Sequence, residues 1–209
     1  MKALSLPLAF AAVLLAAGCS LPPAQPDLTR YYVLTTAAAR SNAVAPAGPH
    51  WRVALRPVEV PSFLRGKIMQ VRVAPNELTY LDEVRWAETL EAGVGRVLRE
   101  SLEGRGEIAR VVASPAEEHD FDIAVRILRC EGDREKGVAR FTAAVELYSA
   151  SGERRGRDIF TTEVPGWDRS NYGQLAAMLS EAVDSFGDRI VTLLGQAETP
   201  SAKSPTPSG

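Results

Sequence analysis

An apolar segment at the N-terminus, Ala3–Gly18, sets the first limit on what this chain can fold into. Lys2 is the only charged residue before Asp27, and small residues occupy the end of the segment. A basic residue, a short apolar run and small residues at its end are typical of a cleaved export signal, and the run is short for a membrane span of about 20 residues. We therefore predict that residues 1–18 are a signal peptide and take no part in the folded domain.

The residue after this segment is Cys19, preceded by Leu15-Ala16-Ala17-Gly18. A cysteine at this position resembles the lipobox of bacterial lipoproteins, whose thiol carries the lipid anchor. The alternative is an ordinary signal peptide that happens to contain a cysteine. We predict lipid attachment at Cys19, followed by a proline-rich tether to residue 29. Ser20, where inner-membrane retention usually has Asp, favours the periplasmic face of the outer membrane in a two-membrane bacterium.

Composition limits the classes of protein that the rest of the chain can belong to. The 24 basic and 26 acidic side chains give a formal net charge of −2 without any basic stripe, which excludes a typical nucleic-acid-binding surface. Residues 197–209 are rich in Pro, Ser and Thr and are predicted to be disordered. Residues 30–196 suffice for one domain. With Cys19 lipidated, Cys130 has no disulfide partner, so we expect it to be a small buried apolar residue.

Hydrophobic periodicity predicts short strands and two helices. Alternating or β-rich runs indicate strands at Tyr31–Leu34, Trp51–Val58, Ile68–Val73, Leu78–Leu81, Ile108–Ala113, Asp120–Cys130, Val138–Ala150 and Asp158–Val164. Apolar residues spaced by three and four indicate one helix that Asp82 caps, with Trp86 on its apolar face, and a second helix over about 171–194. The last three strands form a meander, and a turn at 74–77 indicates a hairpin.

These elements predict an α/β fold, a single layered domain in which two main amphipathic helices pack on a mixed β-sheet. The strand–helix–strand passage through residues 68–113 would form a right-handed crossover if its strands pair in parallel.

Several short motifs occur in a characteristic order behind the lipobox. They are Tyr31-Tyr32-Val33-Leu34, Val58-Glu59-Val60-Pro61-Ser62-Phe63-Leu64, Trp86-Ala87-Glu88-Thr89-Leu90, Phe121-Asp122-Ile123 and Arg129-Cys130-Glu131-Gly132. Together they resemble the PqiC (YmbA) family of ABC-type transport auxiliary lipoproteins, over about residues 27–195. Arg65-Gly66 and Thr89 depart from the family's frequent Asp-Arg and Pro.

The resemblance implies a layered α/β domain and a role in lipid traffic between two membranes, without catalysis and without a cofactor. The implied partners are a periplasmic MCE-domain protein, an inner-membrane permease system reached indirectly, and the membrane through the anchor. The protein would dock on or cap a conduit, with a homo-oligomeric ring as one form of assembly.

Other chemistry finds little support in the sequence. His50 and His119 are the only histidines. His119, Asp120 and Asp122 are better explained as the solvent-exposed start of a strand than as the ligands of a metal ion. Gly93-Val94-Gly95 lies inside a helical pattern and lacks the lysine of a phosphate loop, so close packing explains it better. A carrier with its own apolar cavity for an acyl chain, and an activator of a cell-wall enzyme, remain the two alternative functions.

The candidate partner surface comes from residues that the fold does not obviously require. It comprises Pro61, Ser62, Phe63 and Leu64 just after a strand, Trp86, and the basic turn residues Arg154, Arg155 and Arg157. Apolar side chains in a loop need a cover, because burial of each yields roughly 1.5–3 kcal/mol. Trp86 on an apolar helix face belongs to the core by default, whereas for Phe63 and Leu64 the sequence leaves core and partner surface equally open.

Overall fold

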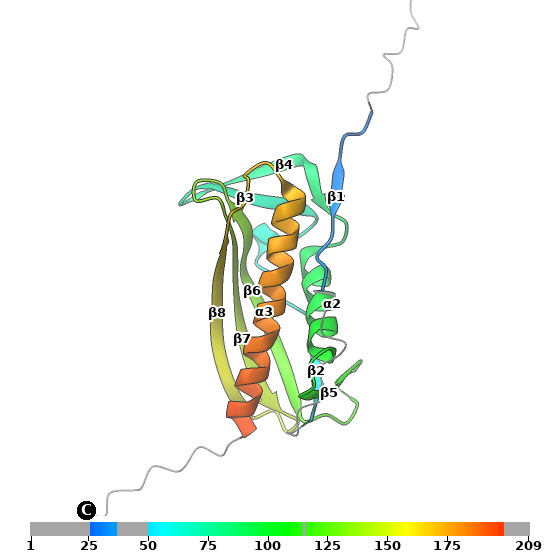
Figure 1. Cartoon of the computed structure of the whole chain (residues 1–209). Helices are drawn as coiled ribbons and strands as arrows, with labels where there is room; N and C mark the ends of the chain where they lie inside the picture. The colour runs from blue at the N-terminus through cyan, green and yellow to red at the C-terminus, as the bar shows by residue number, and fades with distance from the viewer. Residues whose placement is uncertain (1–25, 37–49, 115, 199–209) are drawn as a thin grey trace, which may run out of the picture.

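The computed structural model describes residues 26–36, 50–114 and 116–198 and forms one eight-stranded sheet with helices on one face (Figure 1). The predicted signal peptide, Cys19, and residues 37–49 and 199–209 lie outside the described residues. The strands are β1 (Arg30–Tyr32), β2 (Trp51–Leu55), β3 (Ile68–Ala74), β4 (Glu77–Trp86), β5 (Ile108–Val112), β6 (Phe121–Asp133), β7 (Val138–Ser149) and β8 (Arg154–Pro165). The helices are the 3-10 turn η1 (Ser62–Leu64), α2 (Leu90–Glu103) and α3 (Tyr172–Glu198).

The long strand β6 organises the sheet. On one side it pairs antiparallel with β7, which pairs antiparallel with the edge strand β8. On the other side, its first half pairs parallel with β2, and β5 follows beyond. Its last residues pair parallel with β3, and β4 and β1 follow beyond that. The sheet is therefore mixed, as predicted, and it divides into two branches on this side of β6.

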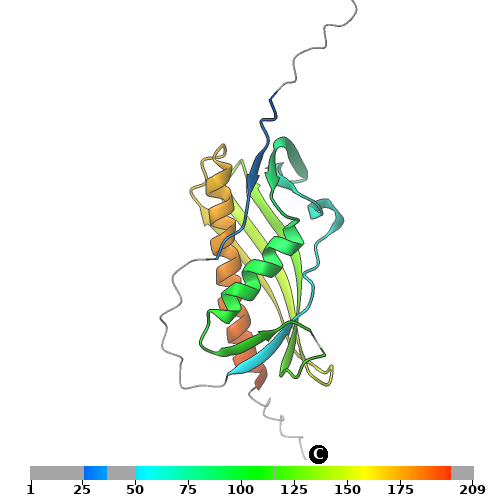
Figure 2. The same ribbon diagram turned by 90° about the vertical axis from the view of Figure 1, so that its right-hand side faces the viewer.

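Both helices cover the same face of the sheet, side by side (Figures 1 and 2). α3 packs on β7 and β8, whereas α2 packs against α3 and β5. The core-facing residues of β6 and β7 alternate along each strand, which is why Ile123, Val125, Phe141 and Val145 are almost fully buried. No helix of the described residues lies on the opposite face of β6, β7 and β8 (Figure 1).

A buried ionic cluster joins the two helices. Arg105, just after α2, has a side chain only 4% exposed, and its Nη2 lies 3.5 Å from Asp184 Oδ1 and 3.0 Å from Asp188 Oδ1. Ser101 on α2 also donates a hydrogen bond to Asp184. Because a buried guanidinium without a partner is costly, this cluster fixes how α2 lies against α3.

The fold class, the 74–77 hairpin, the closing helix and the three-strand meander agree with the sequence prediction. The predicted start of the first helix is wrong. Residues 77–86 pair with β3 instead, with Arg85 opposite Ile68, and the Trp86 amide donates to Lys67 O at 2.6 Å. Asp82 therefore lies within β4 and caps nothing, and the residue at the N-cap of α2 is Thr89.

Two further differences concern pairing and the last helix. β3 and β4 do not pair with β5, whose partner is β2, so strands 68–73 and 108–113 form no direct parallel unit. α3 continues through Ala197 and Glu198, which were predicted from composition to lie in the disordered tail. Ala197 is 8% exposed and follows Leu194 on the apolar face by three residues, so packing extends the helix.

Candidate functional site

The segment after β2 carries the candidate partner surface and is held tightly along β6. The Arg56 amide donates to Ile123 O and the Glu59 amide to Val125 O, both at 2.9 Å. Ile127 in turn donates to Glu59 O at 2.8 Å. These hydrogen bonds make residues 56–60 a strand-like extension, so the turn η1 that follows starts from a fixed position.

Within η1 the residues divide between core and surface. Leu64 is 1% exposed and belongs to the hydrophobic core, whereas Phe63 is 41% exposed. The Phe63 carbonyl accepts a 3.0 Å hydrogen bond from Nε2 of Gln70, a side chain that is itself buried. Leu64 and Gln70 therefore hold the turn in place, and Phe63 and Ser62 face outward from it.

Burial removes two of the predicted surface residues from that surface. Trp86 is 2% exposed at the end of β4, and Leu64 is equally enclosed. Of the two possibilities that the sequence left open for them, core and interface, the structure places both side chains in the core, where a partner cannot reach them without unfolding the monomer. Sequence spacing placed Trp86 on a helix, whereas β-pairing with Lys67 and packing in the core place it in a strand.

The predicted basic turn lies at the start of the edge strand β8, and its arginines are exposed. Arg155 Nη1 lies 3.3 Å from Glu153 Oε2, and Arg154 Nη1 lies 3.8 Å from Glu146 Oε1. These contacts hold the first two arginines near their own acidic neighbours. Arg157 instead points to a groove on the open face of the sheet.

That groove was not predicted from the sequence. It has a volume of about 770 Å³, is open to solvent and crosses the helix-free side of β6, β7 and β8. Ala124 and Ala144 line it, and so does Arg56, whose guanidinium lies 4.8 Å from the ring centre of Tyr148. The alternation of small or polar residues with apolar ones along 121–149 was the signal that could have located this face.

His119, the candidate metal ligand, lies against residues close to it in the sequence. His119 Nδ1 lies 2.7 Å from Glu117 O, and Nε2 lies 3.5 Å from Asp122 Oδ1. Arg56 occupies the other oxygen of Asp122 at 3.0 Å, and Asp120 accepts from the Arg52 amide at 2.7 Å. Within 26–36, 50–114 and 116–198, no three His, Cys, Asp or Glu side chains gather as a metal site.

Cys130 is 1% exposed, which confirms the prediction of a buried apolar residue. Burial, with a smaller contribution from the neighbouring Glu131, raises the pKa of its thiol to about 12. The thiol is therefore protonated and chemically inert at neutral pH.

We expect native Cys130 to resist alkylation at pH 8 and to react only when the domain unfolds. Because the pKa is raised in the folded state, the stability linked to this thiol is present below its ordinary value of 9.0 and is lost as the pH rises toward about 12. Cys130→Ser should fold with a loss of about 1–2 kcal/mol. Thiol trapping of Cys130 in a disulfide with a second subunit would contradict this assignment.

The fold and this surface define an α/β domain with one face covered by helices and one polar face left open. The chain belongs to the family of ABC-type transport auxiliary lipoprotein components, whose model matches residues 32–191. Within the described ranges, neither α2 nor α3 combines the length and hydrophobicity that a bilayer crossing requires.

Solved structures support the same fold. The chain is similar to protein XCC0632 from Xanthomonas campestris, of family DUF330, with 21% identity, a TM-score of 0.66 and coverage of 82% of this chain and all of that one. It is also similar to an uncharacterised protein with 16% identity and a TM-score of 0.61, over 79% of this chain and 98% of that one. At these identities the likeness shows the fold alone. No curated protein sequence matches the chain.

Proposed function

We propose that this protein is a lipid-anchored, non-enzymatic component of an intermembrane lipid transport system, held at the periplasmic face of the outer membrane through Cys19. It docks on or caps the conduit of a periplasmic MCE-domain protein and so connects indirectly to an inner-membrane permease. A ring of identical subunits is the assembly that suits a cap on a conduit, because subunits anchored in one membrane share one orientation. Membership of the transport auxiliary lipoprotein family supports this role.

The docking proposal rests on Phe63, whose side chain is exposed and is not required to hold the turn η1 in place. Its neighbour Leu64 and the buried amide of Gln70 already fix η1. An aromatic side chain that is 41% exposed on a rigid turn costs little entropy to bury against a partner. The proposal therefore places the docking contact at Ser62 and Phe63, supported from behind by Leu64.

The interior supports docking rather than enclosure of lipid. Phe141, Phe160 and Phe186 pack with tilted rings between the sheet and α3, with ring centres 5.5–6.4 Å apart. Aromatic packing of this kind fills the space where a carrier would need an apolar cavity for an acyl chain. The groove beside Arg157 is open to solvent and has charged walls.

Phe63→Asp is expected to leave the monomer stable and to break the docking contact. The side chain is already half in water, so the free energy of unfolding should change by no more than about 0.5 kcal/mol. Loss of an aromatic anchor of about 2 kcal/mol should weaken co-purification of the MCE-domain protein about thirty-fold. Thermal denaturation and quantitative pull-down from membranes measure the two effects.

Two further variants complete this experiment. Leu64→Asp should destabilise the monomer itself by several kcal/mol, because it buries a charge in the core. Ile159→Asp is the surface control, since Ile159 is 65% exposed on β8. If Phe63→Asp assembles and functions normally while Ile159→Asp does not, the interface lies on β8 beside Arg154, Arg155 and Arg157. In that case the assignment to η1 is wrong.

A further inference from the structure

Most of the large hydrophobic side chains that the described residues expose lie in one region. Six are exposed, and they are Leu28, Tyr31, Val33, Phe63, Tyr80 and Ile159. Leu28, Tyr31 and Val33 lie on or next to β1, and Tyr80 lies on β4, the strand with which β1 pairs. Such side chains are ordinary when scattered, but four in one region indicate a contact.

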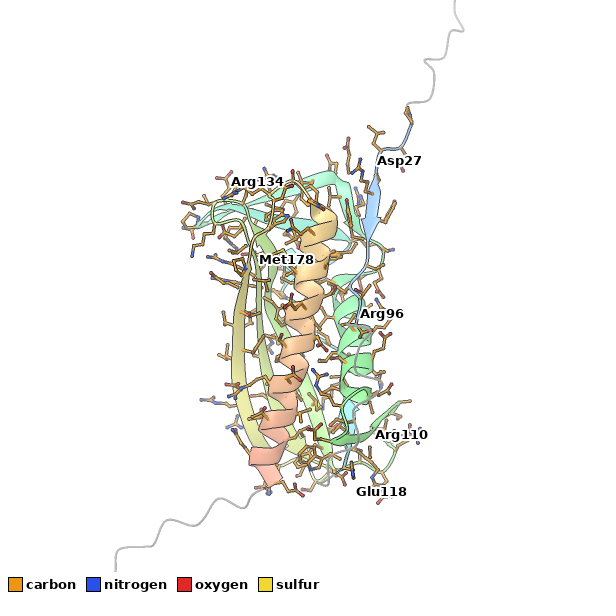
Figure 3. All side chains as sticks on the ribbon, viewed as in Figure 1. Asp27, Arg96, Arg110, Glu118, Arg134 and Met178 are labelled. Carbon is orange, nitrogen blue, oxygen red and sulfur yellow. The ribbon has the colours of Figure 1, made fainter. Side chains whose placement is uncertain are left out.

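β1 and the β3–β4 hairpin together form one end of the elongated domain (Figure 1). Asp27 and Arg134 lie at this end, whereas Glu118 and Arg110 lie at the opposite end, near the C-terminal end of α3 (Figure 3). The described chain enters the domain at the first end, through Pro26 and β1. The exposed apolar side chains of β1 and β4 are thus at the end where the chain enters.

The distance to the proposed lipid anchor is short. Cys19 precedes Pro26 by seven positions, and seven residues span at most about 25 Å when fully extended. An anchor at Cys19 therefore keeps the end formed by β1 and β4 close to the bilayer, whatever path the tether takes. This step rests on the anchoring that the proposed function assigns to Cys19.

We propose that this end of the domain contacts the bilayer surface directly, with Leu28, Tyr31 and Tyr80 placed among the lipid headgroups. Tyrosine suits that zone, because its ring is apolar and its hydroxyl remains hydrated. Leu28 is 63% exposed and Tyr31 is 59% exposed, and odd and even positions of an extended chain point to opposite sides. If this extended segment enters the membrane surface with its end first, lipid headgroups can surround it and contact the side chains on both of its sides.

Charge does not provide this contact. β1, β4 and the residues just before β1 carry both signs, since Asp27, Asp82 and Glu83 accompany Arg30 and Arg85. Contact should therefore depend on apolar and aromatic side chains, not on anionic lipid. It should also persist in about 0.5 M NaCl, where electrostatic screening is strong.

The test uses the full lipidated protein with one reporter cysteine. Tyr80→Cys and Leu28→Cys carry an environment-sensitive dye, and Ser151→Cys carries it in the β7–β8 turn at the opposite end. Cys130 does not compete for the dye, because its thiol is buried and its pKa is raised. The protein is reconstituted in vesicles of phosphatidylethanolamine and phosphatidylglycerol that contain brominated phosphatidylcholine. Flotation of the vesicles reports anchoring separately.

We expect quenching of about two-fold or more at positions 28 and 80 and little at position 151, since bromine quenches only dyes within the bilayer interface. Flotation without quenching at 28 and 80 would overturn the membrane contact and leave the anchor intact. Failure to float would overturn the anchor and the contact with it. Fluorescence of the dye at position 80 could also be unaffected by brominated lipid but change when the protein is diluted. That result would assign this end to a contact with a neighbouring subunit, which also overturns the proposal.

Discussion

Gly132→Ala should destabilise the domain by about 3 kcal/mol or more, a large effect for the addition of one methyl group. A Cβ atom at Gly132 would lie 2.5 Å from Cζ3 and 2.7 Å from Cη2 of Trp167, and 2.9 Å from Cδ2 of Leu175. Both side chains are almost fully buried. Trp167 cannot move away easily, because its indole donates to Asn171 O at 2.9 Å and its amide donates to Gly137 O at 2.9 Å.

Thermal denaturation measures this effect, and a loss of about 3 kcal/mol corresponds to a decrease in Tm of roughly 6–12 °C for a domain of this size. Gly95→Ala is the matched control. A Cβ there meets only Val58 Cγ2, at 3.6 Å, inside helix α2. That variant should be unchanged or more stable by up to about 1 kcal/mol, because alanine favours a helix over glycine.

A second variant checks the cause of the clash. In Gly132→Ala combined with Trp167→Leu, the smaller side chain makes room for the methyl group. The two changes should then cost less together than the sum of their separate costs. Strict additivity, or a Gly132→Ala protein as stable as the wild type, would show that the contact with Trp167 does not determine the glycine.

Cys19→Ala should abolish attachment to the membrane completely. Each buried methylene of an acyl chain contributes about 0.8 kcal/mol, so loss of all acyl chains removes far more binding than any surface contact of the domain supplies. The variant should no longer incorporate a fatty-acid analogue, and it should remain uncleaved or become soluble in the periplasm. Metabolic labelling and membrane fractionation provide the measurement.

Cys130→Ala serves as the control for that experiment, since it removes the other cysteine and should leave labelling and fractionation unchanged. Normal membrane attachment of Cys19→Ala would exclude Cys19 as the anchor. It would also remove the distance argument that places β1 and β4 at the bilayer. Phe63→Asp in an otherwise anchored protein tests the docking surface independently of both results.

The motif Arg129-Cys130-Glu131-Gly132 has a structural role that the sequence alone does not reveal. Its glycine allows Trp167 and Leu175 to approach β6, and Cys130 packs in the core. Glu131 is fully enclosed, and Arg72 approaches it with Nε at 2.5 Å from Oε1. The partners of Gly132 are 35 and 43 positions away in the chain, so only the packed structure identifies them.

The sequence by itself determined the elements whose signal is local. The strands of the meander follow from alternation along 120–164, the hairpin follows from its turn residues, and α3 follows from apolar spacing over three turns and more. Each of these features depends on neighbours within a few residues, which the sequence displays directly.

Tertiary structure alone decided where β4 ends, which residues of 61–64 face outward, and how the sheet divides beyond β6. Residues 82–86 have an amphipathic pattern that suits a helix, but hydrogen bonds to β3 and burial of Trp86 hold them in a strand. Phe63 and Leu64 are adjacent apolar residues that no local rule separates, and the core takes one and leaves the other exposed. Contacts between distant segments outweigh local propensity because they bury more apolar surface than any local preference can offset.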